Sequence, residues 1–227
     1  MLAGEAVVAI WNGIAPEARE QFYDWHTNEH MPERVGIPGF RRGRRYIATD
    51  ADTMPEFFTL YEADTMQVLQ GIDYANRLNN PTPGTKSTTA QFRDTSRALS
   101  RVIVSHGAGM GGTLLTIRFD CDAQHLAALR ALVRAVAQAR RITGAHLCMG
   151  DAEASSVRTT ETRDRTDIQA PPNLFVMVEA TDADALTDIL QERALTGAGA
   201  RGPFARGPFA RGIYRLEYTR TKTGFAP

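Results

Sequence analysis

The chain has 227 residues, and its 26 Lys and Arg side chains balance 26 Asp and Glu side chains, so no net charge draws it to nucleic acid or an anionic membrane. Two isolated cysteines exclude a disulfide framework and a Cys-x-x-Cys site, and no apolar run approaches the ~18 residues of a membrane span. We therefore expect a cytoplasmic protein with a packed core and with neither nucleic-acid nor membrane partners.

The first half of the chain alternates short apolar runs with amphipathic ones. The pattern predicts a strand, a helix, two strands, a helix and a strand, at residues 6–11, 16–30, 40–48, 57–61, 65–78 and 100–105. Pro32 disfavours helical backbone at the preceding residue, so we expect the first helix to end at about His30. Residues 85–97 are polar and are expected to form a loop.

The second half repeats this order. Its predicted elements are at residues 113–119, 122–141, 145–149, 174–178, 182–195 and 212–218. Residues 151–172 are polar and Thr-rich, which suggests a long exposed hairpin loop. Glu62 and Glu179 each precede an alanine at the end of a predicted strand, which supports an internal duplication. The predicted fold is α+β, with two ferredoxin-like βαββαβ units, residues 1–108 and 109–227, packed sheet to sheet as a barrel within one chain.

The first predicted helix concentrates groups that can move protons. His26, Glu29 and His30 lie within five residues of one another. With successive residues placed ~100° apart around the helix, Glu29 falls in the middle of an apolar stripe, and the two histidines lie beside it. The stripe consists of Ala18, Phe22 and Trp25. A carboxylate on an apolar face is costly to bury unless it is paired, and this marks Glu29 as a candidate functional residue.

Residues 22–46 carry a family pattern. An aromatic-rich helix contains His30-x-Pro32, and residues 37–39 (Ile-Pro-Gly) precede a strand that carries Tyr46. This arrangement resembles the EthD-like branch of the dimeric α+β barrel (ferredoxin-like) superfamily. The resemblance implies that two units fused in one chain replace the usual homodimer. The superfamily includes cofactor-free monooxygenases, isomerases, cyclases, dehydratases or decarboxylases, and haem enzymes.

The second half lacks the His-x-Pro pattern, so we expect one functional pocket, in the first half. Histidines titrate near neutral pH and can give or take protons, and Glu29 can hold an imidazole in one tautomer. The catalytic candidates are His26, Glu29, His30 and Tyr46, whose hydroxyl can bind a carbonyl or enolate oxygen. The substrate-binding candidates are Trp25, Arg34, Arg44 and His106. The predicted function is isomerase, dehydratase, decarboxylase or cyclase chemistry on an aromatic or cyclic carbonyl compound, without a cofactor.

Other interpretations stay open at this stage. The polar residues can satisfy one another in a buried seam, and the barrel can be a non-catalytic small-molecule-binding or stress-type protein. A cofactor-free monooxygenase and a haem enzyme are weaker alternatives. His26-x-x-Glu29-His30 also matches a two-histidine zinc pattern, with His106 as a third ligand, although we expect no metal. The expected partner is a small-molecule substrate, and a homodimer is possible.

Overall fold

The computed structural model describes residues 1–107, 109–192 and 206–223. The first half contains the strands β1 (Ala6–Ile14), β2 (Phe40–Ala48), β3 (Phe57–Ala63) and β4 (Phe92–His106). Its helices are η1 (Pro16–Ala18), α1 (Arg19–Trp25), η2 (His26–His30), α2 (Met31–Gly36), α3 (Met66–Leu69), α4 (Ile72–Asn79) and α5 (Pro83–Thr89).

The second half contains the strands β5 (Thr113–Asp120), β6 (Ile142–Gly150), β7 (Ile168–Gln169), β8 (Leu174–Ala180) and β9 (Arg206–Thr221). Its helices are η3 (Ala123–His125), α6 (Leu126–Val136), α7 (Ala152–Ser156) and α8 (Ala183–Glu192). The predicted order of strands and helices is therefore present in both halves. No helix in the described ranges is long and apolar enough to cross a membrane.

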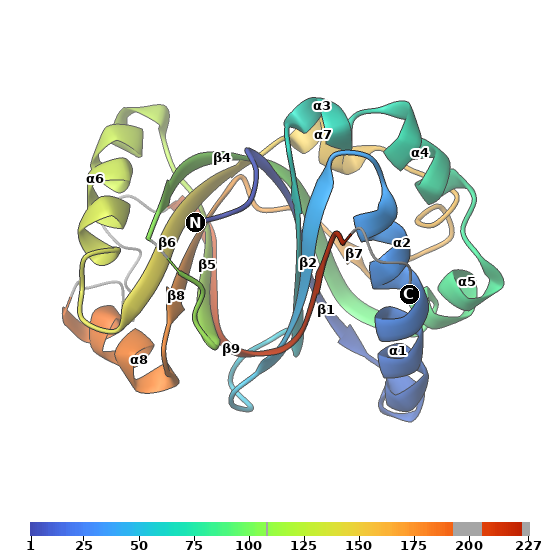
Figure 1. Cartoon of the computed structure of the whole chain (residues 1–227), viewed down its shortest axis with the longest axis horizontal. Coiled ribbons are helices and arrows are strands. Elements are labelled where there is room, and N and C mark those ends of the chain that lie inside the picture. Colours follow the sequence, from blue (N-terminus) through green and yellow to red (C-terminus); the bar gives the residue numbers. More distant parts are fainter. Residues whose placement is uncertain (108, 193–205, 224–227) are drawn as a thin grey trace.

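Eight of the described strands form a closed antiparallel barrel, seen in Figure 1. Their order is β1-β3-β2-β9-β5-β8-β6-β4, and β4 pairs back onto β1. Within each half the fourth strand lies beside the first, the first beside the third, and the third beside the second. The two halves meet where β2 pairs with β9 and where β4 pairs with β6. The chain thus has a mixed α+β fold of the dimeric α+β barrel type, closed by a single polypeptide; an origin by tandem duplication stays a prediction.

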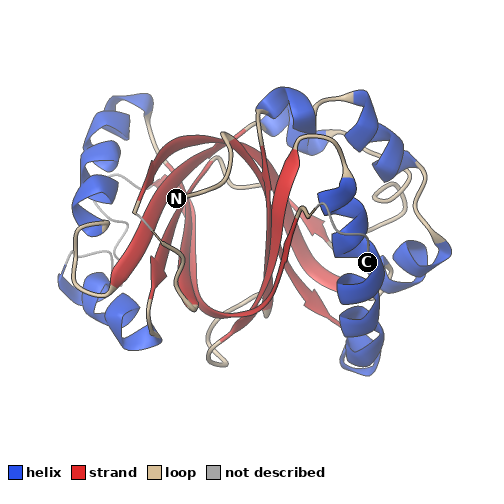
Figure 2. Cartoon of the chain, in the orientation of Figure 1, coloured by secondary structure: helices blue, strands red, loops and turns tan. Residues whose placement is uncertain are grey.

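Helices cover the barrel on two opposite sides, as Figure 2 shows. Strand residues alternate between the barrel interior and these helix-covered outer faces. Val7 and Trp11 of β1 join Phe58 of β3 in the interior cluster, whereas Val8 and Tyr61 pack outward against the first-half helices. The outer face of the first-half sheet is therefore the surface on which a site beneath those helices is built.

The prediction that Pro32 ends the first helix is wrong. The helix continues to Gly36 through the π-helical turn His26–His30, in which the Met31 N–H donates to the His26 carbonyl five residues back. This wider turn accommodates the missing N–H of Pro32, which in a regular α-helix would leave a carbonyl without its donor. One extra residue in the helical repeat also rotates everything after it by about 100° relative to the residues before it.

Two predicted loops are also wrong. Residues 85–97 contain most of α5 and the start of β4, which begins at Phe92. Residues 151–172 are not a freely exposed hairpin: they contain α7 and β7, and β7 pairs in parallel with Thr95 and Ser96 of β4. This segment belongs to the second half in sequence but packs on the first half.

Candidate functional site

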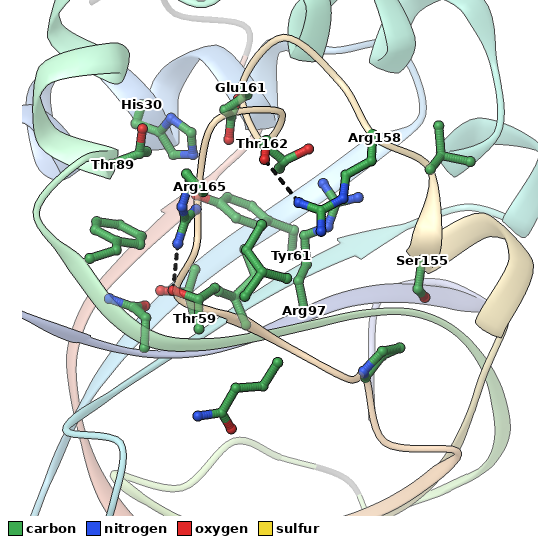
Figure 3. Close-up of a pocket in the computed structure, with 18 of the residues that line it drawn as sticks. His30, Thr59, Tyr61, Thr89, Arg97, Ser155, Arg158, Glu161, Thr162 and Arg165 are labelled. Carbon is green, nitrogen blue, oxygen red and sulfur yellow. Dashed lines mark hydrogen bonds between the residues drawn. The ribbon is translucent and has the colours of Figure 1, made fainter.

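A cavity of about 380 Å³ lies between the helices of the first half and the outer face of its sheet. Its floor consists of residues of β1, β3 and β4, and one wall is formed by α1 and the π turn. Residues 155–171 of the second half form its roof, which crosses above the strands in Figure 3. The site is therefore built from both halves of the chain.

Aromatic side chains give the cavity a flat, apolar lining. Phe22 stacks on His26 with 5.2 Å between ring centroids, and Trp25 lies 4.2 Å from the ring of His30. Phe92 meets both Phe22 and Trp25 edge-on. Offset and edge-to-face contacts of this kind hold rings in fixed orientations. The lining suits a planar, mostly apolar ligand.

The π turn places both histidines against the cavity. His26 is 3% exposed and His30 is 6% exposed, and their rings stack with 5.8 Å between centroids. π-helical turns occur often at functional sites, because the extra residue redirects the side chains that follow. Here it brings His30 to the cavity.

The hydrogen bonds of His26 determine its tautomer. Arg45 Nη1 lies 3.2 Å from Nδ1 of His26, and a guanidinium can only donate. Nδ1 must therefore accept, so the neutral ring carries its proton on Nε2. That Nε2–H faces the hydroxyl oxygen of Tyr61 at 3.3 Å and donates to it. The Tyr61 hydroxyl proton is consequently left to donate to a ligand in the cavity.

The same environment keeps these groups uncharged. Burial, followed by the charges of Arg45 and Arg34, lowers the pKa of His26 well below 6.5. Burial, followed by the charges of Arg34 and neighbouring groups, does the same to the pKa of His30. Burial raises the pKa of the Tyr61 hydroxyl. At pH 7 the cavity therefore contains two neutral imidazoles and a neutral phenol.

His30 presents one ring nitrogen to the cavity. Its Nδ1 is buried without a hydrogen-bond partner, which leaves Nε2 as the nitrogen able to meet a ligand. The ring of Tyr61 lies 6.4 Å away in an edge-on arrangement, and both side chains are labelled in Figure 3. A proton acceptor and a hydroxyl donor thus border the same space.

A buried ion pair fastens the roof to the first half. Arg34 is 3% exposed and pairs with Glu161 of the roof. The Glu161 N–H also donates to the Leu78 carbonyl at 3.1 Å, and the Thr160 N–H donates to Asn79 Oδ1 at 3.1 Å. Because the pair is desolvated, loss of either charge would leave the other uncompensated. These contacts hold the roof over the histidines.

Three further arginines line the cavity. Arg165 is neutralised by Asp167, with Nη2 2.7 Å from Oδ2, and it also donates to Thr95 Oγ1 at 2.6 Å. Arg158 donates to the Thr162 carbonyl at 3.1 Å. Arg97 comes from β4, and its side chain has no ion pair in the described part of the chain.

Glu29, a predicted catalytic residue, does not line the cavity. It is half-buried and accepts a hydrogen bond from the Thr82 hydroxyl beside the start of α5. A Cβ added at Gly84 would lie 2.6 Å from its Oε2, so Glu29 packs closely on that turn. The extra residue of the π turn explains this position, because regular helical spacing would have kept Glu29 on the apolar face.

The predicted Tyr46, Arg44 and His106 also lie away from the cavity. Tyr46 belongs to the cluster inside the barrel, and its hydroxyl has no hydrogen-bond partner. Arg44 is fully buried between Glu62 and Glu179. His106 ends β4, where it pairs with Ala145 of β6. Of the eight predicted site residues, the structure brings together His26, His30 and Trp25 at the cavity, with Arg34 behind the roof contact.

Among the described residues, the corresponding interface between helix and sheet in the second half is aliphatic. Leu129, Val133 and Val136 of α6 pack on Leu115 and Ile117 of β5 in an aliphatic cluster. Aliphatic side chains interdigitate at high density, whereas the rings beneath α1 leave a hollow.

Sequence reasoning missed Tyr61, Glu161, Arg97 and Arg158. Tyr61 had a usable signal, because alternation along its strand places the polar atoms of Thr59 and Tyr61 on the face opposite Phe58. Glu161 in the roof had no such signal in the sequence, because its partner Arg34 lies roughly half of the chain away. The histidines and Glu29 of the zinc pattern do not form a metal site with a third ligand. Within the described ranges, no three His, Cys, Asp or Glu side chains are placed to bind a metal.

Comparison with known proteins identifies the fold. No protein-family model matches the chain, and no curated protein matches it significantly. An anthrone oxidase-like protein has a similar structure, with a TM-score of 0.60 at 12% identity over 95% of this chain and 92% of that chain. A proposed monooxygenase from Fusobacterium nucleatum subsp. nucleatum has a TM-score of 0.56 at 11% identity, over 99% of this chain and 98% of that chain. A mutant chlorite dismutase from Candidatus Nitrospira defluvii has a TM-score of 0.51 at 9% identity, over 94% of this chain and 92% of that chain. The chain thus shares the fold of dimeric α+β barrel proteins.

Proposed function

We propose that this chain is an EthD-like enzyme that transfers a proton on an aromatic or cyclic carbonyl compound bound in the first-half cavity. The observation that supports this most directly is the fixed tautomer of His26, which frees the Tyr61 hydroxyl to donate. The aromatic lining and the buried position of both groups supply a low-dielectric site in which such a hydrogen bond is strengthened.

The proposed step uses two residues in direct contact with substrate. Neutral His30 accepts a proton from the acidic carbon through Nε2, and the electron pair of the C–H bond moves to the carbonyl oxygen. Tyr61 donates a hydrogen bond to that oxygen as it gains negative charge. Return of the proton to a different carbon completes an isomerisation, and loss of a leaving group completes an elimination. His26 acts through Tyr61 and is a positioning residue.

The step is tested by hydrogen exchange under argon. Anthrone is the probe for two reasons. One structural neighbour is an anthrone oxidase-like protein, and the anion that anthrone forms on losing a methylene proton is conjugated with its carbonyl group. We expect the protein to accelerate deuterium uptake from D₂O at these protons, measured by mass spectrometry. Tyr61→Phe is expected to slow the reaction about 10²-fold, as for loss of one oxyanion donor. His30→Gln is expected to slow it by about 10²-fold or more.

Two controls match these variants. Tyr46→Phe removes another buried tyrosine hydroxyl, inside the barrel, and His106→Gln changes a histidine away from the cavity. Both should keep the wild-type rate. A protein that binds anthrone without accelerating exchange would instead be a non-catalytic binding barrel. If the protein consumes oxygen in air, and if this consumption depends on Tyr61 and His30, the same proton transfer would be the first step of an oxidation.

A further inference from the structure

The charges around the cavity do not balance. Four ionic side chains line it: Arg97, Arg158, Glu161 and Arg165. Glu161 is neutralised by Arg34 from behind the wall, and Arg165 is neutralised by Asp167. Arg97 and Arg158 have no ion pair with any carboxylate in the described ranges. The cavity therefore presents two uncompensated positive charges.

The two arginines approach from different elements. Arg97 projects from β4 in the floor, and Arg158 comes from the roof, where the Thr162 carbonyl holds its guanidinium at 3.1 Å. Figure 3 shows both side chains reaching the same side of the cavity, away from His30. Arg97 is partly buried and Arg158 is exposed to solvent, and an anion bound between the two guanidinium groups would interact favourably with both.

We propose that the substrate carries a carboxylate, held by Arg97 and Arg158, in addition to the carbonyl or enol oxygen that Tyr61 meets. A guanidinium binds a planar carboxylate through two parallel N–H donors, which gives orientation as well as affinity. One end of a flat ring system then lies against the histidines while the acid group is fixed at the opposite side. This assignment rests on the proposed function, because it takes the same cavity as the ligand site.

Two fluorescent naphthalene probes test the assignment by equilibrium titration. 2-Naphthol presents only a hydroxyl, and 6-hydroxy-2-naphthoate carries the same hydroxyl with a carboxylate at the far end. We expect the naphthoate to bind wild-type protein at least about tenfold more tightly, the size of one charge-assisted contact. Arg97→Gln and Arg158→Gln should each reduce this advantage, and the double variant should abolish it while the affinity for 2-naphthol stays unchanged.

Arg163→Gln is the matched control, since Arg163 lies in the same segment, is exposed and does not line the cavity. It should keep the full preference. In wild-type protein the affinity for the naphthoate should fall with added NaCl while that for 2-naphthol does not, which tests the charge effect without any substitution.

The outcomes separate this assignment from the proposed function. Equal affinity for the two probes overturns the carboxylate assignment alone. A carboxylate preference that depends on Arg97 and Arg158, found together with no acceleration of anthrone exchange, overturns the proposed chemistry and keeps the binding site. Failure of both probes to bind overturns the cavity as a site for aromatic ligands, and with it both proposals.

Discussion

Arg44 and Glu179 come from opposite halves of the chain and form an ion pair inside the barrel, with 3.0 Å between Nη1 and Oε1. Glu62, at the corresponding end of β3, lies 3.0 Å from Nη2 of the same guanidinium. His146 of β6 lies 3.2 Å from Glu179 as well. Burial alone would raise the pKa of Glu179, but the hydrogen bond from His146 and the charge of Arg44 lower it to about 2. One guanidinium thus links two buried carboxylates across the junction of the halves.

Substitution Arg44→Met is expected to destabilise the protein by about 3–5 kcal/mol, because buried Glu179 loses its arginine partner, whereas Glu62 keeps its ion pair with Arg42. Urea unfolding followed by tryptophan fluorescence measures the change. Arg41→Met is the control: its pair with Asp64 is exposed, with the Arg41 side chain 56% accessible, so solvent screens the pair and we expect much the smaller change. A loss below about 1 kcal/mol in Arg44→Met would contradict a stabilising role for this cation.

Glu161→Gln is expected to cost about 2–4 kcal/mol, because Arg34 stays buried without its counter-charge. The roof should also loosen, which amide hydrogen exchange across residues 155–171 would report as faster exchange. Substitution of Glu153 by Gln, at an exposed position two residues before the roof, should change neither measurement. Unaltered exchange in Glu161→Gln would show that the backbone contacts alone hold the roof.

The tautomer of His26 can be read directly by ¹⁵N NMR. We expect a non-protonated Nδ1 and a protonated Nε2 at pH 7, since Arg45 only donates. In Arg45→Met the pKa of His26 should rise, because one of the charges that lower it is removed. A wild-type spectrum with the proton on Nδ1 would refute the role assigned to Tyr61 as a free donor.

Stability should fall as the solution is acidified below about pH 6.5. Burial lowers the pKa of His26, His30 and His146 in the folded state, so below 6.5 the unfolded chain binds more protons. Their contribution is present above this value and is lost as the pH falls toward the lowered folded-state values. The slope is at most about 1.4 kcal/mol per pH unit for each histidine.

Urea unfolding at pH 7.5, 6.5 and 5.5 measures this dependence. His30→Gln removes one titrating group without breaking a hydrogen bond at Nδ1, so its slope should be smaller than that of wild type. A free energy of unfolding that stays constant from pH 7.5 to 5.5 would mean that these rings accept protons in the folded state.

The sequence was sufficient for the order of elements but not for the local geometry of the site. Alternation and helical periodicity report which face of a segment is buried, and both halves follow those rules. Glu29 was misplaced because ideal spacing assumes an uninterrupted helix, and nothing in residues 26–30 announces a π turn. Pro32 is the available clue: local rules predict that it ends the helix, while the structure accommodates it inside a continuing helix.

The roof shows a second limit. Arg34 and Glu161 are separated by 127 positions, and no local pattern pairs them. The composition of residues 151–172 predicts a solvated loop, yet Glu161 pairs with Arg34 and Asp167 accepts a hydrogen bond from Thr95, both in the first half. Tyr61 was within reach of sequence reasoning, since only the outward face of its strand can meet the helix that carries the histidines.

Because a single polypeptide supplies both the floor and the roof of the cavity, the site assembles in a unimolecular event. Its integrity does not depend on protein concentration, whereas a cavity shared between separate subunits is lost when they dissociate on dilution. The two halves of the chain are also free to differ in sequence. One half can therefore change to bind a ligand while the other keeps a close-packed core.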